Sequence, residues 1–278
     1  MSARSFLYIP GDREEFLTKA FDRGADAIIA DLEDGVAPAA KDAARKIVAG
    51  WIEQEPGAQT WVRLNSGALM EADVTAVCAP GLTGVVLPKA SIDALASLDV
   101  LLTIAEKRAD LAEGTVLVCP LIETAQGVLD VRLITEAPRV SHLAIGEVDL
   151  GAELNITDAD AMNPIRMQLV VASAAAGISP PTAPVATDFQ DLDALRSSTL
   201  RLKAMGFGAR AAIHPAQVPP INEVFTPTTE EIEAARELVT TYDAALARGN
   251  GVIKDADGKM VDEAVVRSAR RTLTRAKL

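Results

Sequence analysis

The sequence is poor in histidine, cysteine and aromatic residues. Its 278 residues include two His and two Cys, and only 4% are aromatic. Two histidines exclude a zinc site built from histidine alone, so any metal here must be held mainly by carboxylates. The cysteines, Cys78 and Cys119, lie far apart and do not indicate a disulfide framework. We expect both to be buried as small apolar residues.

Positive charge and long apolar runs are also scarce. The chain has 27 Lys+Arg against 39 Asp+Glu, a formal net charge of −12. This acidity argues against nucleic acid or an anionic membrane as a partner, because both bind basic surfaces. No stretch approaches the roughly 18 apolar residues of a membrane span, and the run at 6–10 is too short for a signal peptide. We therefore expect a soluble, cytoplasmic protein with no nucleic-acid or membrane partner.

Short runs rich in Val, Ile and Leu alternate with longer amphipathic stretches. Continuous apolar runs are typical of buried parallel strands. Prolines in 178–185 predict a short or irregular seventh strand. An eighth is predicted at 209–213, and the first six runs are 5–9, 27–31, 60–64, 84–87, 116–120 and 140–145. Eight strand–helix units in about 225 residues favour an α/β fold, a (β/α)8 TIM barrel over residues 1–225, rather than a doubly wound sheet. No glycine-rich dinucleotide fingerprint follows the first run.

Helices are predicted between these strands from their capping residues and periodicity. Asp12 with Glu15 resembles an N-cap pair, and Gly24 stands where a C-cap glycine belongs. The longer predicted helices are 39–53, 98–113, 163–176 and 191–205.

Residues 226–278 are predicted to form a C-terminal helical and hairpin extension. Thr228 and Glu231 make a capping box for a helix that reaches Gly249. A hairpin turning at Asp257-Gly258 and a last helix over 262–277 follow. The extension is too small for a core of its own, so we expect a lid that packs on its barrel or on a neighbouring subunit. From 254 to 278 it carries seven basic and four acidic residues. This excess fits ordinary helix-dipole complementation, or contact with the phosphates of a ligand or with an acidic subunit surface.

Polar residues follow most of the predicted strands, where TIM barrels place their catalytic groups. They are Asp31, Glu33, Asp34, Arg63, Asn65, Lys89, Glu123, Glu147, Asp149 and His214. Converging carboxylates repel one another unless a cation neutralises them, and Mg²⁺ suits a site with few carboxylates, water and substrate oxygens. The residues therefore predict a metal-assisted enzyme for an anionic, oxygen-rich substrate, with Arg63 as its fixed cation.

Each of these residues also has an alternative role. The loop containing Asp31, Glu33 and Asp34 could be an ordinary polar loop, or one that contacts a metal through water. Glu123 and Asp149 could cap helices, and Arg63 could belong to a structural ion pair. We expect His214 to be a hydrogen-bonded residue at a strand end rather than a catalyst.

A set of short motifs runs in order along nearly the whole chain. They are RSFLYIPG at 4–11, GAD at 24–26, DLEDG at 31–35, K at 41 with AR at 44–45, VRLN at 62–65, LPK at 87–89, LIET at 121–124, GEVDL at 146–150, AIHPAQ at 212–217 and GKMVD at 258–262. In these motifs the chain resembles the citrate lyase β-subunit-like enzymes of the HpcH/HpaI aldolase superfamily, which belong with the malyl-CoA and citramalyl-CoA lyases. The set is specific, although no single motif would be.

The resemblance implies a Mg²⁺-dependent TIM barrel that cleaves or forms a carbon–carbon bond in a short 3-hydroxyacyl-CoA. Malyl-, citramalyl- or citryl-CoA would give an acyl-CoA and a small 2-oxo acid. It implies that Glu123 and Asp149 hold the metal, with Glu123 also facing the substrate. Arg63 would bind the substrate and stabilise the thioester enolate.

The resemblance also assigns an acid/base role to Asp262, which would reach the active site of an adjacent subunit. A homotrimer or dimer of trimers would fit this arrangement. From the residues themselves, we expect Glu33 and Asp34 to lie around the metal ligands or to contact the metal through water. The chain departs from the family pattern at Ala264, where the family often has proline, and at Ala209-Arg210, where Gly-Lys is usual.

Several other activities remain compatible with the same residues. The chain could be the β subunit of a multiprotein citrate lyase acting on an acyl-carrier-protein thioester. It could be a malyl-CoA-type thioesterase, in which water attacks the bound thioester after cleavage. A metal-dependent aldolase for free 2-oxo acids, which needs no CoA, and a non-catalytic binding module are the remaining alternatives.

Overall fold

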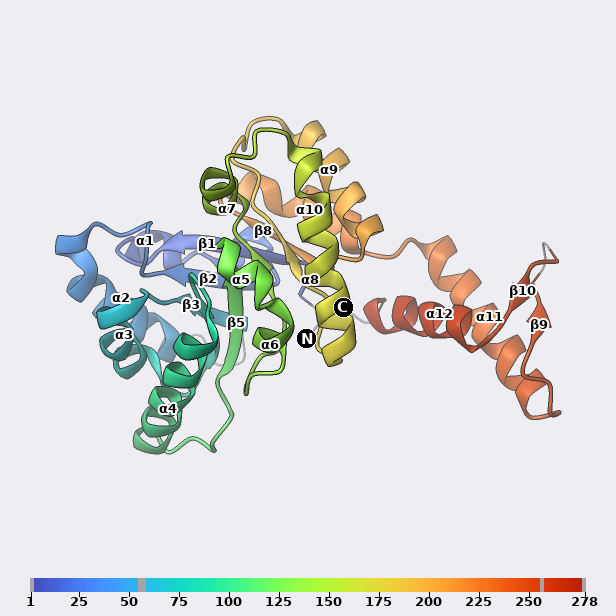
Figure 1. The fold of residues 1–278 in the computed structure, drawn as a ribbon, viewed down its shortest axis with the longest axis horizontal. Helices are drawn as coiled ribbons and strands as arrows, with labels where there is room; N and C mark the ends of the chain where they lie inside the picture. Colours follow the sequence, from blue (N-terminus) through green and yellow to red (C-terminus); the bar gives the residue numbers. More distant parts are fainter. Residues whose placement is uncertain (1–2, 55–58, 256–257, 277–278) are drawn as a thin grey trace. The chain divides into compact units, whose positions relative to one another are not determined.

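Eight parallel strands close into a barrel in the computed structural model of the chain, which describes residues 3–54, 59–255 and 258–276 (Figure 1). Each strand pairs with its neighbours in sequence, and β1 pairs with β8 through Ser5 opposite Arg210. The barrel strands are β1 (Ser5–Pro10), β2 (Ala27–Asp31), β3 (Gln59–Arg63), β4 (Leu82–Leu87), β5 (Leu117–Ile122), β6 (Ala144–Ile145), β7 (Thr182–Ala183) and β8 (Ala209–Ala212). The predicted (β/α)8 TIM barrel is confirmed.

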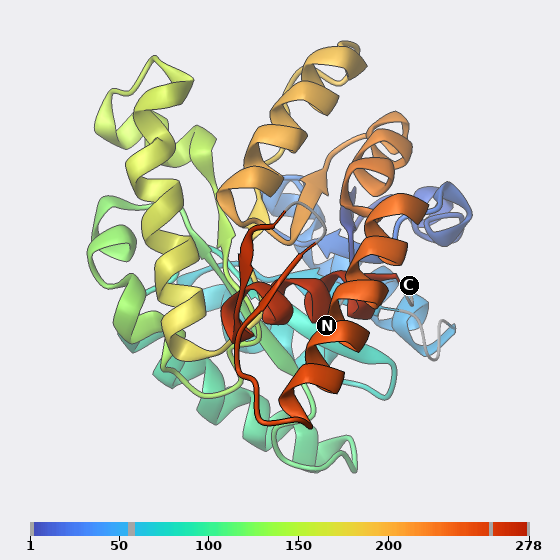
Figure 2. The same ribbon diagram turned by 90° about the vertical axis from the view of Figure 1, so that its right-hand side faces the viewer.

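Helices surround the outside of these strands (Figure 2). Those that follow the barrel strands are α1 (Glu14–Leu17), α2 (Lys41–Gln54), α3 (Met70–Val77), α4 (Ile92–Arg108), α5 (Ala125–Leu129), α6 (Val131–Thr135), α7 (Glu147–Leu154), α8 (Asn163–Ala176), α9 (Leu192–Met205) and α10 (Val218–Phe225). None of the described helices is long and apolar enough to cross a membrane.

The helix boundaries show where capping residues and periodicity were sufficient to predict the ends of a helix. Helix α8 coincides with the predicted 163–176, and Gly24 is left-handed after a short 3-10 turn, as a C-cap glycine should be. The predicted start of α4 at residue 98 is wrong, because the helix begins six residues earlier, at Ile92. Ser91 caps it by accepting from the Ala94 N–H. Asp12 is not a cap, since α1 begins at Glu14 and Arg13 holds its N-cap position.

The strand boundaries differ mainly where prolines or irregular pairing intervene. Strand β2 coincides with the predicted 27–31, and β7 is as short as the prolines predicted. The predicted end of the fifth strand at Pro120 is wrong, because Leu121 and Ile122 pair with β6. The sixth run is strand only at its end, although Val140 forms an isolated bridge with Val118.

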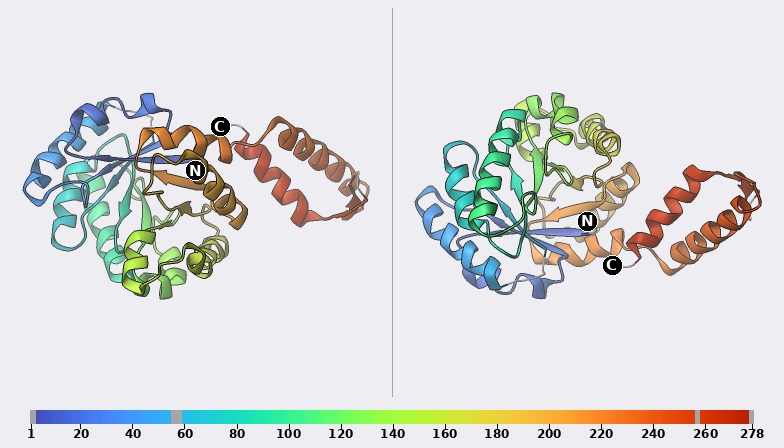
Figure 3. Two further views of the ribbon diagram at one scale, coloured as in Figure 1. Left: turned by 90° about the horizontal axis from the view of Figure 1, so that it is seen from above. Right: turned by 90° about the horizontal axis from the view of Figure 1, so that it is seen from below.

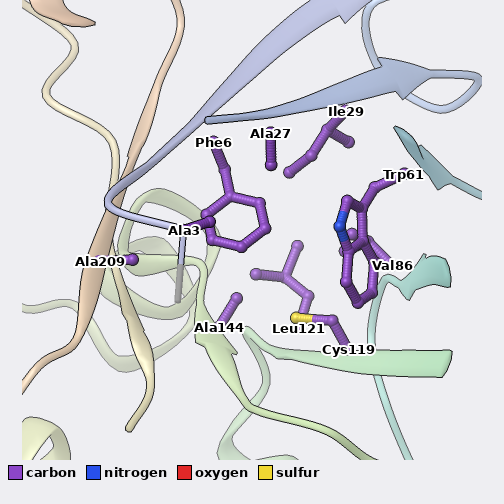
Figure 4. Packing of buried hydrophobic residues seen from close by; sticks show 10 residues of the cluster. All are labelled: Ala3, Phe6, Ala27, Ile29, Trp61, Val86, Cys119, Leu121, Ala144 and Ala209. Atoms are coloured by element: carbon purple, nitrogen blue, oxygen red, sulfur yellow. The ribbon is translucent and has the colours of Figure 1, made fainter. Parts of the chain in front are cut away.

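The barrel interior is filled by inward-facing side chains from different strands (Figure 4). Phe6 meets Trp61 edge-on at 6.1 Å between ring centroids. Gly84 makes room for this indole, since a Cβ there would lie 2.4 Å from a Trp61 ring carbon. Cys119 belongs to this cluster and Cys78 is buried elsewhere, and both are free thiols as predicted. The interior is a packed core, so chemistry is left to the barrel's rim.

His142 is buried in this core, where its ring stacks on Phe6 at 5.3 Å between centroids. Burial lowers the pKa of His142 to about 4 from 6.5. Because the unfolded chain binds the proton first, we expect the free energy of unfolding to fall as pH drops from about 6.5 to 4, by up to about 3 kcal/mol. Above pH 6.5 this loss should be absent. Denaturant titrations across this pH range measure it.

The chain supplies a matched control in its second histidine. His142→Phe keeps an aromatic ring and should flatten the pH dependence over this interval. His214→Asn is the matched control, because His214 caps a short 3-10 helix from a half-buried position and Asn is a preferred capping residue, so the fold should be retained. If the free energy of unfolding depends on pH equally in the wild type and in His142→Phe, this role of His142 would be contradicted.

The chain divides into two compact units, Ala3–Asn222 and Glu223–Leu278. The second unit contains α11 (Thr229–Leu246), the antiparallel pair β9 (Ile253–Lys254) and β10 (Met260–Val261), and α12 (Glu263–Arg275). The two long helices lie side by side (Figure 3). The Thr228–Glu231 capping box is confirmed.

The second unit also contains the predicted hairpin turn and a small apolar cluster. Gly258 is left-handed in the predicted turn, whereas Asp257 and Lys277 lie outside the described residues. Tyr242, Val261 and Val266 form a buried apolar cluster within the unit. The extension therefore has a small core of its own, which the sequence reasoning did not expect.

Candidate active site

Asp31 organises the loop after β2 at the carboxyl ends of the barrel strands. Its Oδ1 accepts from the Glu33 N–H at 2.8 Å, and its Oδ2 accepts from the Gly35 N–H at 2.8 Å. A Cβ at position 35 would lie 2.5 Å from Asp31 Oδ2, so this close approach requires glycine. The loop is therefore a built structure around a buried carboxylate rather than an ordinary polar loop.

Arg63, at the end of β3, is clamped by this carboxylate. Its Nε and Nη2 donate to the two Asp31 oxygens at 2.7 and 2.6 Å, a bidentate pair. The guanidinium also lies over the Tyr8 ring, 5.2 Å from its centroid. Nη1 is 2.9 Å from Glu33 Oε2, which accepts no hydrogen bond among the described residues. Arg63 thus forms a structural ion pair with Asp31, and its Nη1 donates no hydrogen bond to a described residue although it lies beside the Glu33 carboxylate.

Several motif residues form hydrogen bonds that hold the loops after β2 and β3 in place. Lys41 Nζ donates to two backbone carbonyls of the loop after β2, both at 2.7 Å. Arg45 Nε donates to Asp73 Oδ1 at 2.6 Å, and Asp73 Oδ2 accepts from the Asn65 N–H and Nδ2 at 2.7 and 2.8 Å. Asp73 belongs to no motif and was not among the predicted site residues, although it is completely buried.

Glu123 follows β5 directly and is 3% exposed. Its Oε1 accepts the Lys89 N–H at 2.7 Å. A Cβ on Gly146 would lie 2.6 Å from Oε2, so glycine is needed beside it. Burial raises the pKa of Glu123 to about 7; the Lys89 hydrogen bond opposes this rise, and the charges of Glu33 and Asp149 add to it. Glu123 is thus a buried carboxylate without a full counter-charge.

The two acidic residues at the start of α7 have different environments. Glu147 is neutralised by Arg166, whose Nε and Nη2 donate to its two oxygens at 2.6 Å each. Asp149 is exposed and has no hydrogen bond or ion pair with any described residue. It is close enough to Glu123 for its charge to raise the pKa of that carboxyl. Asp149 is therefore available to a ligand, whereas Glu147 is occupied.

Negative charge exceeds positive charge at this rim. Arg63 pairs with Asp31, and Lys89 Nζ lies 3.0 Å from Glu33 Oε1. Arg63 Nη1 also lies 3.5 Å from Oδ2 of the mostly exposed Asp34. Glu123 and Asp149 form no ion pair with any described residue. In the described parts of the chain, no three His, Cys, Asp or Glu side chains gather as metal ligands. Two carboxylates, with water and substrate oxygens in the other positions, are the ligand set that Mg²⁺ commonly uses.

A family comparison bears directly on these residues. The sequence pattern of the HpcH/HpaI aldolase/citrate lyase family matches residues 4–215, from the start of β1 to beyond β8. The chain belongs to this family.

Similar proteins in the family span almost the whole chain. A (3S)-malyl-CoA thioesterase from Cereibacter sphaeroides is 34% identical, covering 98% of this chain and 94% of its own length. The citrate lyase subunit beta of Leuconostoc mesenteroides is 29% identical, with coverages of 97% and 92%. A crystal structure of CitE from Mycobacterium tuberculosis, in complex with magnesium, acetoacetate and coenzyme A, superposes with a TM-score of 0.77 at 29% identity, with coverages of 100% and 99%.

Within this HpcH/HpaI chain, two predicted residues serve as helix caps. His214 Nδ1 accepts from the Ala216 N–H at 3.2 Å, which confirms the structural role expected for it. Asp262 lies in the second unit, where its Oδ1 accepts from the N–H groups of Ala264 and Val265 at 2.9 and 3.2 Å. The Ala264 N–H is a donor that a proline at this position would lack.

Proposed function

We propose that the chain is a Mg²⁺-dependent carbon–carbon lyase for a short 3-hydroxyacyl-CoA such as malyl-, citramalyl- or citryl-CoA. The products would be an acyl-CoA and a small 2-oxo acid, and the reaction can also run toward synthesis. The observation that carries the proposal is the pair Glu123 and Asp149, two carboxylates that form no ion pair with any described residue, at the same barrel rim as the clamped guanidinium of Arg63.

Glu123 and Asp149 would hold the cation. Both offer hard oxygen donors, and Glu123 combines burial with a missing counter-charge, which a divalent cation would supply. When bound, Mg²⁺ would act as a Lewis acid that polarises the carbonyl oxygen of the 2-oxo acid. Glu33 and the exposed Asp34 would contact its hydration water rather than the ion itself, because Arg63 and Lys89 already engage Glu33.

Arg63 would bind the substrate and stabilise charge on the thioester. Breaking the bond between the thioester α-carbon and the hydroxyl-bearing carbon leaves an electron pair on the thioester enolate, while the hydroxyl loses its proton and its carbon becomes the carbonyl of the 2-oxo acid. A guanidinium held in advance by Asp31 can donate to this oxyanion without reorganising, which is the condition for strong electrostatic stabilisation. Glu123, beside the substrate position, would also help to define it.

Asp262 would be the acid/base that protonates the enolate carbon, or removes a methyl proton in the synthetic direction. Its capping bonds use only Oδ1, so Oδ2 is available for proton transfer. We propose that the C-terminal unit acts as a lid over the active site of a neighbouring subunit, in a homotrimer or dimer of trimers. Mixing inactive Arg63 and Asp262 variants should restore activity if the site is shared.

Incubating the purified chain and Mg²⁺ with malyl-, citramalyl- and citryl-CoA tests the activity. We expect one of these esters to yield an acyl-CoA and a 2-oxo acid. Asp149→Ala should lose nearly all turnover and its dependence on Mg²⁺, whereas Asp160→Ala, at an exposed 3-10 turn, should retain both. Absence of product from every ester would refute the proposal, and an unchanged Asp149→Ala rate would remove that residue from the site.

Thioester hydrolysis is the second candidate, because the Cereibacter sphaeroides relative at 34% identity is a (3S)-malyl-CoA thioesterase. The products distinguish the two reactions. Hydrolysis of malyl-CoA releases free CoA with malate, whereas cleavage alone releases acetyl-CoA with glyoxylate. Free CoA that accumulates from the first turnover would favour the thioesterase.

The similarity to a citrate lyase subunit beta supports a third candidate, a subunit that acts on an acyl-carrier-protein thioester. Turnover of free CoA esters by the isolated chain would count against it. A chain that converts only the carrier-bound citryl thioester would instead favour the subunit role.

A further inference from the structure

Lys89, just after β4, adopts a backbone conformation that is unusual for its residue type. Its φ is 48°, in the left-handed region, which a residue with a Cβ adopts at an energetic cost. Asn and Asp enter this region most readily, and Asp110 and Asn155 do so here. Lysine has no such local compensation, so the surrounding structure must impose this conformation.

The left-handed turn allows Lys89 to connect three strands. Its N–H donates to Glu123 Oε1 after β5 at 2.7 Å, and its Nζ donates to Glu33 Oε1 after β2 at 3.0 Å. The chain then turns so that the Ala90 N–H reaches the Leu121 carbonyl on β5 at 3.3 Å. A single residue thus contacts two acidic side chains that follow strands on opposite sides of Arg63's strand, β3.

The backbone contact is the stronger of these two links. The Lys89 side chain is 48% exposed, and ion pairs at exposed sites are weak. The contact with Glu123, in contrast, is a charge-assisted hydrogen bond to a residue that is 3% exposed. It is the only hydrogen bond that Glu123 accepts within the described residues, and it leaves Oε2 unbonded beside Gly146.

We propose that Lys89 is a positioning residue whose left-handed backbone directs its N–H to Glu123 Oε1 and so turns Oε2 toward a divalent cation. The inference rests on the proposed function for the choice of cation. Partners that orient metal ligands in this way commonly change metal affinity by 10- to 100-fold when they are disrupted.

Two substitutions separate the effect of the Lys89 backbone conformation from the effect of its side chain. Lys89→Gly and Lys89→Val both remove the ammonium, but only glycine tolerates the left-handed conformation without strain. We expect the dissociation constant for Mn²⁺, measured on the full chain without substrate by electron paramagnetic resonance, to be at least 10-fold larger for Lys89→Val than for Lys89→Gly. If the valine variant does not fold, Lys89→Ala and Lys89→Asn provide the same contrast, because Asn tolerates the conformation better than Ala.

Asp110→Gly and Asp110→Val are the matched controls, because Asp110 is left-handed (φ 58°) in an exposed turn after α4. They should differ in thermal stability and bind Mn²⁺ equally. Equal Mn²⁺ affinity for the Gly and Val variants of Lys89, or no Mn²⁺ binding by the wild type, would overturn the inference. A wild type that binds Mn²⁺ but converts no CoA ester would refute the proposed function and leave the role of Lys89 intact.

Discussion

Arg63→Met is expected to lower kcat by about 100- to 1000-fold and to reduce the free energy of unfolding by about 3 kcal/mol. The kinetic loss follows from removing a preorganised donor at the position where charge develops. The loss of stability follows because Asp31, 4% exposed, would lose its bidentate hydrogen-bonding partner. Steady-state kinetics and denaturant titration measure the two effects on the same preparation.

Two further variants show whether charge or geometry carries these effects. Arg63→Lys keeps the charge but loses the two-pronged contact, so it should recover most of the stability and little of the rate. Arg132→Met removes an exposed i,i+4 ion pair with Glu136 and should change the free energy of unfolding by less than about 0.5 kcal/mol. A fully active Arg63→Lys would show that the bidentate clamp is unnecessary for catalysis.

The barrel was predictable because its main signals are local. Continuous apolar runs mark buried parallel strands wherever they occur, and β2 was predicted residue for residue. The errors arose where pairing between distant segments decides the outcome. The fifth strand was predicted to end at Pro120. In the structure it continues, because Leu121 and Ile122 pair with β6.

The candidate site was predictable as a set of residue types but not as a network. The sequence placed Arg63, Glu123 and Asp149 at strand ends, because polar residues directly after apolar runs are conspicuous. It could not show that Asp31 clamps Arg63 or that the Lys89 backbone holds Glu123. These contacts join residues 32 and 34 positions apart, and only the closed barrel brings them together. Gly146 was a detectable signal, since it lies in a motif, but its reason is the close approach of Glu123.

Cation binding is expected to weaken about tenfold for each pH unit below about 7. Burial raises the pKa of Glu123 to about 7, with the charges of Glu33 and Asp149 adding to the rise. Below that pH the carboxyl is protonated, and the proton competes one-for-one with the cation. Above it the carboxylate is free of protons and the affinity should level off. Mn²⁺ titrations between pH 5.5 and about 8.5 measure the dissociation constant directly.

The pH dependence should belong to Glu123 rather than to the rim as a whole. Glu123→Gln keeps the size of the side chain and an oxygen that can accept the Lys89 N–H, but it cannot titrate. We expect its Mn²⁺ affinity to be at least 10-fold weaker than that of the wild type at pH 8 and nearly independent of pH near 7. Asp149→Asn, in contrast, should weaken binding while the inflection near pH 7 persists or moves lower, because the charge of Asp149 helps to raise the pKa of Glu123. An inflection near pH 7 that survives in Glu123→Gln would assign the titration to another group and remove Glu123 as the carboxylate for which proton and cation compete.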